Sequence, residues 1–431
     1  MLFSTTRFLN EEKFIKKTKT LNFQSKVLYF ARYKVNCFIG CLMKKNPVNA
    51  VLPVGASDVL APFAQMEANV QNTVMDLFSS CGYQRIAPSF LEFEETLLAD
   101  NDGGLSLQTL RFCDFVSGKM MGVRADMTMQ AARIAATRLK DLPRPLRVAY
   151  TGTVLRGTCD GLRPRRQVLQ TGAELTGTDC AAADAEIILL AHEALKRVLN
   201  RPVSLDLTLP TLFKALCRAY GVAHEEAKEL QEFLNQKDFY AVKERLSAMG
   251  KKVRDKLSVF ESLFDACGEI SRVLSVLNGV DLPSEARAEC RRLSEVADIL
   301  AHEAPDAFIT ADVLENRGFE YHCGLSFSFF DKISGRELAR GGRYLAGVPY
   351  NCSQAATGVT LMTDAVVELL SQPPEKEKVY VPKGTPFALA MRLIQEGHTV
   401  VFGLGDDWRQ EAQVQDCAYA YIDEQLQKIK K

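Results

Sequence analysis

The stretch that decides the fold is Val148–Gly177, which reads VAYTGTVLRGTCDGLRPRRQVLQTGAELTG. Two runs in which apolar and polar residues alternate, both rich in β-branched side chains, flank a basic loop at 157–166. The loop contains two glycines, one proline and three arginines. This pattern predicts an antiparallel β-hairpin with a functional tip.

Polar side chains suited to binding a zwitterion lie on either side of this loop. Arg156 precedes the loop, while Gln170 and Glu174 follow it. Because the side chains of a strand alternate between its two faces, Gln170 and Glu174 project from the same face. A guanidinium, an amide and a carboxylate on one sheet surface can hold an amino acid. The alternative is a solvated hairpin with ordinary surface charges, and the spacing alone leaves both interpretations open.

The hairpin resembles motif 2 of the class II aminoacyl-tRNA synthetases, in the form found in the histidyl branch. That motif reads F-R-x-E, a loop, and then R-Q-F-x-Q-x-G-x-E. Here LRGT at 155–158 and RQVLQTGAE at 166–174 occupy its two halves, and Thr158 stands where the synthetases carry Glu. Together with the rest of the chain, the resemblance extends to a family of synthetase paralogues, the regulatory subunits of ATP phosphoribosyltransferase.

The segment before the hairpin is similar to the start of histidyl-type catalytic domains. LPVGASD at 52–58 matches their P-x-G-x-x-D pattern. We expect Asp58 to cap a helix that runs to about Cys81, followed by a strand over 83–90. In class II proteins this helix and strand are motif 1 and form the dimer interface. The alternative is a core helix that packs within one subunit.

Two further segments carry candidate pocket residues. VRADMT at 123–128 resembles the family's L-R-P-E-G-T. This resemblance implies that Asp126 receives the α-ammonium of a bound histidine and that Thr128 adds a hydroxyl group. NRGFEYHCG at 316–324 resembles the histidyl signature R-G-L-D-Y-Y. This resemblance implies that Arg317 contacts the histidine carboxylate and that Tyr321 lines the imidazole pocket. His322 stands where the family has a second tyrosine.

The position of motif 3 departs from the synthetases. GVTLMTDAV at 358–366 stands where they read roughly G-x-x-x-G-x-E-R-L, and Ala365 takes the place of the Arg that binds the nucleotide phosphates. RGGRY at 340–344 resembles G-G-R-Y-D, with Leu345 in the place of Asp. Because the motif 2 Glu is also replaced, at Thr158, we expect the enzyme's clamp on ATP to be lost.

Composition limits the partners and the redox environment. The chain has 431 residues, with 53 Lys and Arg against 53 Asp and Glu, and this zero net charge gives tRNA binding no support. The 12 cysteines are scattered, with Cys37 and Cys41 the closest pair. Without a C-x-x-C pair or a Cys/His cluster we expect no metal and no cofactor, and reduced cysteines in a cytoplasmic protein. We expect no membrane segment.

Three parts are expected along the chain. Residues 1–45 are basic. We expect them to be an extension that is disordered or not translated, because Met43 is a plausible start of the protein. The alternative is an organelle-targeting presequence. Residues 46–371 are expected to form an α+β domain like that of class II synthetases, an antiparallel sheet flanked by helices. A helical insertion is expected at about 211–304. Residues 372–431 indicate a short α/β domain of strand, helix, strand and a last helix from Trp408 to Ile429.

The resemblance implies a function as well as a fold. It implies a regulatory subunit without catalytic activity, which binds histidine as a feedback effector and activates the short catalytic subunit of ATP phosphoribosyltransferase. Regulatory subunits would form dimers within a hetero-oligomer, and no tRNA would bind. The alternative is a histidyl-tRNA synthetase-like enzyme that charges tRNA or another acceptor. The expected histidine-binding residues are Asp126, Thr128, Arg156, Gln170, Glu174, Arg317, Tyr321 and His322.

Overall fold

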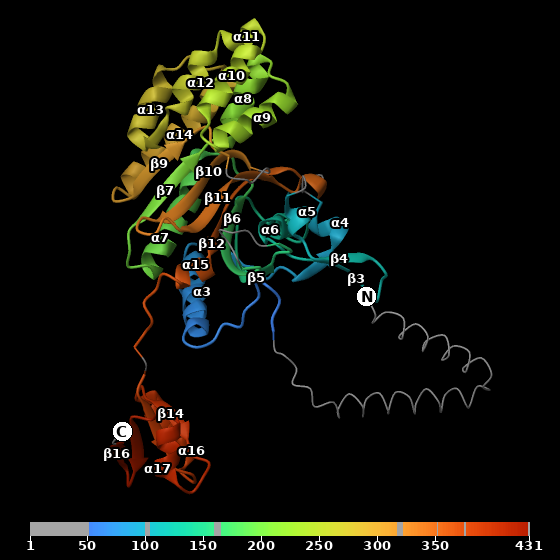
Figure 1. Ribbon diagram of the computed structural model, residues 1–431. Coiled ribbons are helices and arrows are strands. Elements are labelled where there is room, and N and C mark those ends of the chain that lie inside the picture. The colour runs from blue at the N-terminus through green and yellow to red at the C-terminus, as the bar shows by residue number, and fades with distance from the viewer. Residues whose placement is uncertain are drawn as a thin grey trace, which may run out of the picture. The chain divides into compact units, whose positions relative to one another are not determined.

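A sheet of nine strands organises the computed structural model, which describes residues 51–99, 104–158, 165–316, 322–350, 352–374 and 376–429 (Figure 1). The strand order is β1-β5-β6-β12-β11-β10-β7-β9-β8. Strands from β5 to β7 in this order pair antiparallel, whereas β1 joins β5 and β9 joins β7 in parallel. The strand bounds are β1 Gln84–Arg85, β5 Leu146–Leu155, β6 Gln167–Thr176, β7 Val203–Thr208, β8 Cys267–Glu269, β9 Phe308–Asp312, β10 His322–Asp331, β11 Glu337–Ala346 and β12 Gln354–Met362. The predicted α+β fold, a sheet flanked by helices, is confirmed, and the sheet is antiparallel except for the pairs β1–β5 and β7–β9.

The predicted hairpin is formed by β5 and β6, which pair along their whole length. Their alternation separates two environments. Ala173 and Leu175 belong to the main hydrophobic core on one face of the sheet. Gln170 and Glu174 lie on the opposite face, where their side chains are buried among polar groups. The period of two read from the sequence therefore fixes which side chains of β6 can meet a ligand.

Helices cover both faces of this sheet (Figure 1). On one face α3, α7, α8 and α14 pack against the strands around the main hydrophobic core, and on the other face α6 packs against β6 and β11. The bounds of these helices are α3 Phe63–Ser80, α6 Thr128–Thr137, α7 Ala181–Val198, α8 Pro210–Tyr220 and α14 Ser284–Glu303. The apolar residues of α3 recur at helical spacing and face the core, as the buried Met66, Val70, Val74 and Leu77 illustrate.

The start of α3 corrects one prediction. The helix begins at Phe63 with Pro62 at its N-cap, so Asp58 does not cap it. Proline has no N–H to donate and disfavours helical backbone at the residue before it, which explains why the regular helix starts only after Pro62. The strand expected over 83–90 is also shorter, since β1 contains only Gln84–Arg85.

A small second sheet precedes the hairpin, and its order is β2-β4-β3. Its strands are β2 Leu91–Phe93, β3 Arg111–Cys113 and β4 Met120–Val123, with the short helices α4 Glu94–Leu97 and α5 Gly104–Gln108 between β2 and β3. β4 leads directly into the loop that carries Asp126 and then into α6. This sheet thereby places a candidate site residue beside β6.

The segment expected to be a helical insertion is helical with one exception. Its helices between α8 and α14 are α9 His224–Asn235, α10 Phe239–Ala248, α11 Lys251–Arg254, α12 Leu257–Phe264 and α13 Ile270–Gly279. The exception is β8, Cys267–Glu269, which pairs antiparallel with β9 and extends the main sheet. Three residues around Gly268 gave no strand pattern in the sequence, and their pairing depends on β9 being adjacent in space.

The last part of the chain has a core of its own. It contains β13 Lys378–Val381, α16 Phe387–Gln395, β14 Thr399–Phe402, α17 Trp408–Val414, β15 Tyr419–Ile422 and β16 Gln425–Lys428, with the strand order β14-β13-β15-β16. The helix expected from Trp408 to Ile429 is therefore wrong beyond Val414. Asp423 and Glu424 both have positive φ, 50° and 62°, which suits the two-residue turn of a β-hairpin.

Within the described ranges, none of the helices combines the length and apolar character needed to cross a membrane.

Candidate functional site

One end of the site is built around Asp126, in the loop between β4 and α6. Its Oδ1 accepts a hydrogen bond from the Thr128 N–H at 2.7 Å, and its Oδ2 accepts one from Gln170 Nε2 at 3.1 Å. Because a carboxylate only accepts, this contact fixes the amide orientation of Gln170. Gln170 Oε1 is then left buried without a hydrogen-bond partner. A ligand with a donor group, such as an ammonium, can satisfy this oxygen and Asp126 together.

The other end is built around Glu174, whose side chain is 1% exposed. The hydroxyl groups of Tyr150 and Tyr344 donate to its two carboxylate oxygens, each at 2.9 Å. Tyr150 also lies 3.2 Å from Thr128 Oγ1 and 3.3 Å from Thr360 Oγ1, so a chain of polar contacts joins this end to the Asp126 end. Burial raises the pKa of Glu174 to about 8, and the charge of Asp126 adds to the rise, against the two tyrosine hydroxyls.

A pocket beside Glu174 is lined by Thr128, Glu174, His322, Arg340, Tyr344 and Thr360 together with backbone of β11 and β12. A neighbouring cavity shares His322 and Arg340 and continues past Ser326 and Thr208. Both cavities open on the sheet face opposite the main hydrophobic core. The pocket is thus formed by strands β6, β10, β11 and β12.

Glycine keeps the floor of the pocket open. A Cβ atom at Gly358 would lie 1.7 Å from Glu174 Oε2, and one at Gly172 would lie 2.6 Å from the ring and hydroxyl of Tyr150. The side chains of Glu174 and Tyr150 can pack this closely only against a residue that has no Cβ atom. The glycines at 172 and 358 therefore allow the Glu174–Tyr150 contact to form.

His322 lies on the wall shared by the two cavities. Its side chain is buried, and Nδ1 lies 2.8 Å from Ser326 Oγ. Burial lowers the pKa of His322 to about 3, and the positive charge of Arg340 contributes. The imidazole is therefore neutral at pH 7, so one ring nitrogen donates and the other accepts.

The predicted site residues are brought together only in part. Thr128, Glu174 and His322 line the pocket, and Asp126 and Gln170 are joined to it by the contacts above. Arg156 follows the end of β5 and is not among the residues lining the pocket; its N–H donates to the Arg166 carbonyl, and its buried Nε has no partner. The predicted residues Arg317 and Tyr321 lie outside the described residues.

Sequence reasoning assigned no pocket role to Tyr150, Tyr344 or Thr360. The tyrosines stand within stretches that the resemblance marks, VAYTG and RGGRY, and both share the strand face that carries Glu174. A tyrosine on the ligand face of a strand is a usable signal, since a buried hydroxyl needs a polar partner. Naming that partner requires the strand order.

The region of motif 3 carries acidic groups. α15, Thr363–Val367, contains Ala365, and Glu368 directly after it pairs with Arg165 at 2.8 Å and also contacts Arg336. Burial raises the pKa of Asp364, and the backbone N–H of Ala365 and the charge of Arg165 oppose this rise. Burial likewise raises the pKa of Glu67 on α3, where Arg165 opposes the rise and Asp364 adds to it. These carboxylates lie around the segment that resembles motif 3.

Known proteins share this architecture. A family model described as Histidyl-tRNA synthetase matches residues 55–366. A solved ATP phosphoribosyltransferase regulatory subunit/histidyl-tRNA synthetase from Bacillus halodurans C has a TM-score of 0.75 at 23% identity, covering 86% of this chain and 97% of that one. Histidyl-tRNA synthetase from Nostoc sp. PCC 7120 has a TM-score of 0.67 at 16% identity, covering 86% and 90%. The fold and the matched family model define a protein of the histidyl-tRNA synthetase type.

Relatives with higher identity narrow this class. The ATP phosphoribosyltransferase regulatory subunit of Paramagnetospirillum magneticum is 44% identical over 379 residues, which cover 88% of this chain and 97% of the relative. That of Rhodospirillum centenum is 42% identical over 386 residues, covering 89% and 97%. The chain belongs to the family of ATP phosphoribosyltransferase regulatory subunits.

Proposed function

We propose that this chain binds free histidine in the pocket between Asp126 and Glu174 and acts as a regulatory subunit without catalytic activity. The observation that carries the proposal is Gln170 Oε1, a buried acceptor without a donor. At the other end lies Glu174, a buried carboxylate that accepts hydrogen bonds from two tyrosine hydroxyls. Histidine offers an ammonium for the first and an imidazole N–H for the second.

The remaining contacts follow from the same assignment. The ammonium donates to Asp126 and Gln170, near the hydroxyl of Thr128. The imidazole lies toward Glu174 and His322, and the neutral ring of His322 can complement either tautomer of the ligand. By resemblance, Arg317 receives the carboxylate, Tyr321 lines the imidazole, and Arg156 adds positive charge near the loop.

We infer the partners of the proposed complex from the names of the relatives. The short catalytic subunit of ATP phosphoribosyltransferase is the proposed partner, and the regulatory chain activates it and confers inhibition by histidine. Dimers of the regulatory chain form through α3 and β1 within a hetero-oligomer in the cytoplasm. We assign residues 1–45 to an extension and residues 46–371 to the ligand-binding domain with its insertion at about 211–304. Residues 372–431 are assigned to a separate small domain.

Several features disfavour the alternative, an active synthetase. Such an enzyme needs a clamp for ATP, and the chain has Thr158 and Ala365 where the synthetases have Glu and Arg. Removing one preorganised donor to the transition state typically costs about 3–4 kcal/mol. Glu368 and Asp364 add negative charge to the same region, which opposes a polyphosphate.

Calorimetric titration with histidine and with ATP, done separately, tests the binding proposal. Histidine should bind without ATP, and ATP should not bind tightly. Glu174→Ala should weaken histidine binding by about 1–3 kcal/mol, because a donor of the ligand loses its buried acceptor. Glu232→Ala, on the exposed surface of α9, is the matched control and should bind as the unsubstituted chain does. Unchanged affinity in Glu174→Ala would contradict the assignment of the pocket.

An activity assay with the short catalytic subunit tests the regulatory role. Adding this chain should raise transferase activity, and histidine should then inhibit the mixture. Couplings between sites are typically about 1–3 kcal/mol, so the inhibition should be a several-fold to roughly hundredfold effect. Arg317→Ala should weaken inhibition and leave activation intact. Equal inhibition by histidine without this chain would place the effector site elsewhere.

A further inference from the structure

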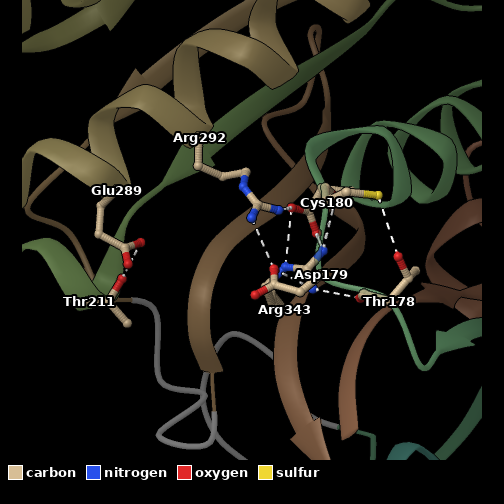
Figure 2. Close-up of polar contacts among 8 residues, drawn as sticks. Thr178, Asp179, Cys180, Thr211, Glu289, Arg292 and Arg343 are labelled. Carbon is tan, nitrogen blue, oxygen red and sulfur yellow. Dashed lines mark hydrogen bonds and ion pairs between the residues drawn. The ribbon is translucent and has the colours of Figure 1, made fainter. Parts of the chain in front are cut away.

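A cluster of charged side chains joins β11 to the start of α7 and to α14 (Figure 2). At its centre the guanidinium of Arg343, on β11, donates from Nε and Nη2 to the two carboxylate oxygens of Asp184, at 3.2 and 2.7 Å. The same guanidinium donates to the carbonyls of Thr178 and Cys180, just before α7, at 3.1 and 3.2 Å. These contacts hold β11 against the start of α7.

A second arginine brings the helical insertion into this cluster. Arg292 on α14 lies 3.4 Å from Asp184 Oδ2 and 3.0 Å from Asp179 Oδ1. Asp179 is also 3.2 Å from Arg343, so both arginines share the same two carboxylates (Figure 2). One turn earlier on α14, Glu289 accepts a hydrogen bond from Thr211 at 2.8 Å. The insertion is therefore attached through α14 to β11 and to the start of α8.

Both attachments are one residue away from the cavities. Side chains alternate along β11, so Arg343 points to the helices while its neighbours Gly342 and Tyr344 line the pocket. Tyr344 is also a hydrogen-bond donor to Glu174. Pro210, which precedes Thr211, lines the neighbouring cavity. These contacts connect α14 with the strand that carries Tyr344 and with the edge of the second cavity.

Burial makes the central contact sensitive to its partners. Asp184 is 1% exposed, and Arg343 is buried beside it. Burial raises the pKa of Asp184, while Arg343 and then Arg292 oppose the rise. A buried carboxylate that loses one of two cationic partners is poorly compensated, which destabilises the arrangement around it.

We propose that Arg292 is a positioning residue for the pocket: through Asp184 and Arg343 it couples the helical insertion to β11, so that binding of the effector orders α14. The inference rests on the proposed histidine site and adds to it the part of the chain that responds to occupancy. Arg292 does not contact the ligand. It acts by holding Arg343, and through β11 the hydroxyl of Tyr344, in the arrangement that binds best.

Hydrogen exchange measured with and without histidine, combined with calorimetry, tests this coupling on the full chain. Histidine should slow exchange in α14 as well as in β6 and β12. In Arg292→Gln the affinity for histidine should fall by about three- to tenfold, in the range of couplings carried by packed networks. At saturating histidine that variant should still protect β6 and β12 but no longer α14. Arg292→Lys, which keeps the charge, should recover part of both effects.

Arg291→Gln is the matched control, because it removes the same charge from an exposed neighbouring position on α14. It should behave as the unsubstituted chain. Absence of α14 protection in the histidine-bound chain would overturn the inference, as would identical affinity and protection in Arg292→Gln and Arg291→Gln. If Arg292→Gln does not fold, the unsubstituted chain and Arg292→Lys decide the question in the same way. Failure of the unsubstituted chain to bind histidine would instead refute the proposed function, and this inference with it.

Discussion

Glu174 should give the protein a dependence on pH that a substitution can remove. The carboxyl group is buried, it accepts hydrogen bonds from two tyrosine hydroxyls, and burial raises its pKa from 4.5 to about 8. Each pKa unit corresponds to about 1.4 kcal/mol, so holding this group ionised in the folded chain costs about 5 kcal/mol. That cost is a large fraction of the free energy of unfolding of an ordinary domain, about 5–15 kcal/mol.

The sign of the effect follows from the direction of the shift. The pKa of Glu174 is higher in the folded chain than in the unfolded chain, so the folded state binds the proton more tightly. The contribution of this group is most favourable below about pH 4.5 and is lost as the pH rises through 8. In Glu174→Gln no proton is exchanged at this position. The variant should therefore lose less stability between pH 5 and 8 than the unsubstituted chain in denaturant titrations.

Ligand binding should be linked to the same proton. In the proposed complex, the ammonium of histidine offsets the negative charge of Asp126 and an imidazole N–H donates to Glu174, so both interactions favour the ionised carboxylate. With a pKa of about 8, Glu174 is ionised in about a tenth of molecules at pH 7 and in about half at pH 8. Histidine affinity should therefore rise about fivefold between pH 7 and 8, with release of close to one proton at pH 7.

Calorimetry in two buffers with different ionisation enthalpies measures both quantities at once. The interval from pH 7 to 8 is chosen because the imidazole of the ligand is then mostly neutral, having a reference pKa of about 6.5. His322, held neutral by its lowered pKa of about 3, does not titrate in this interval. Histidine binding without proton release, or a Glu174→Gln variant with the same pH dependence, would refute the reasoning.

Three further outcomes can be checked separately. Gly358→Ala should displace Glu174 from its tyrosine partners, lower the free energy of unfolding by about 1–3 kcal/mol and abolish histidine binding. Gly279→Ala on α13, where an added Cβ meets nothing within 4 Å, is the control and should have none of these effects. Denaturant and histidine titrations compare the two variants. The purified chain should catalyse neither histidine-dependent pyrophosphate exchange nor tRNA charging, given Thr158 and Ala365, and robust exchange free of host synthetase would overturn that expectation. A chain that begins at Met43 should keep the melting temperature and histidine affinity of the full chain, because residues 1–42 lack the apolar periodicity of the rest; loss of either would contradict this.

The local periodicity of the sequence predicted much of the fold. The β5–β6 hairpin and the shared face of Gln170 and Glu174 follow from the two-residue period of a strand. Local signals were less reliable where one residue overrides a pattern. Pro62 delays the start of α3, and the turn at Asp423 and Glu424 has positive φ without the Gly or Asn that usually marks such turns.

The partners of Glu174 could not be predicted from the sequence in the same way. Tyr150 is on β5, beside β6, but Tyr344 is on β11, which reaches β6 only because β12 lies between them. That strand order is a long-range property, and so is the pairing of β8 with β9. The resemblance indicated which stretches meet in the pocket. The hydroxyl groups that donate to Glu174 are evident only from the three-dimensional structure.

Both ends of the candidate site carry acidic groups in this chain. At the amino-acid end, acidic and amide groups form a connected network with an unmet need for donors, which favours a cationic ammonium. At the phosphate end, Arg165 is already paired with Glu368, and Glu67 and Asp364 add further carboxylates. A bound polyphosphate would have to displace Glu368 from Arg165 and would still face the other two acids. This arrangement supports the proposal that the chain binds an amino acid without ATP.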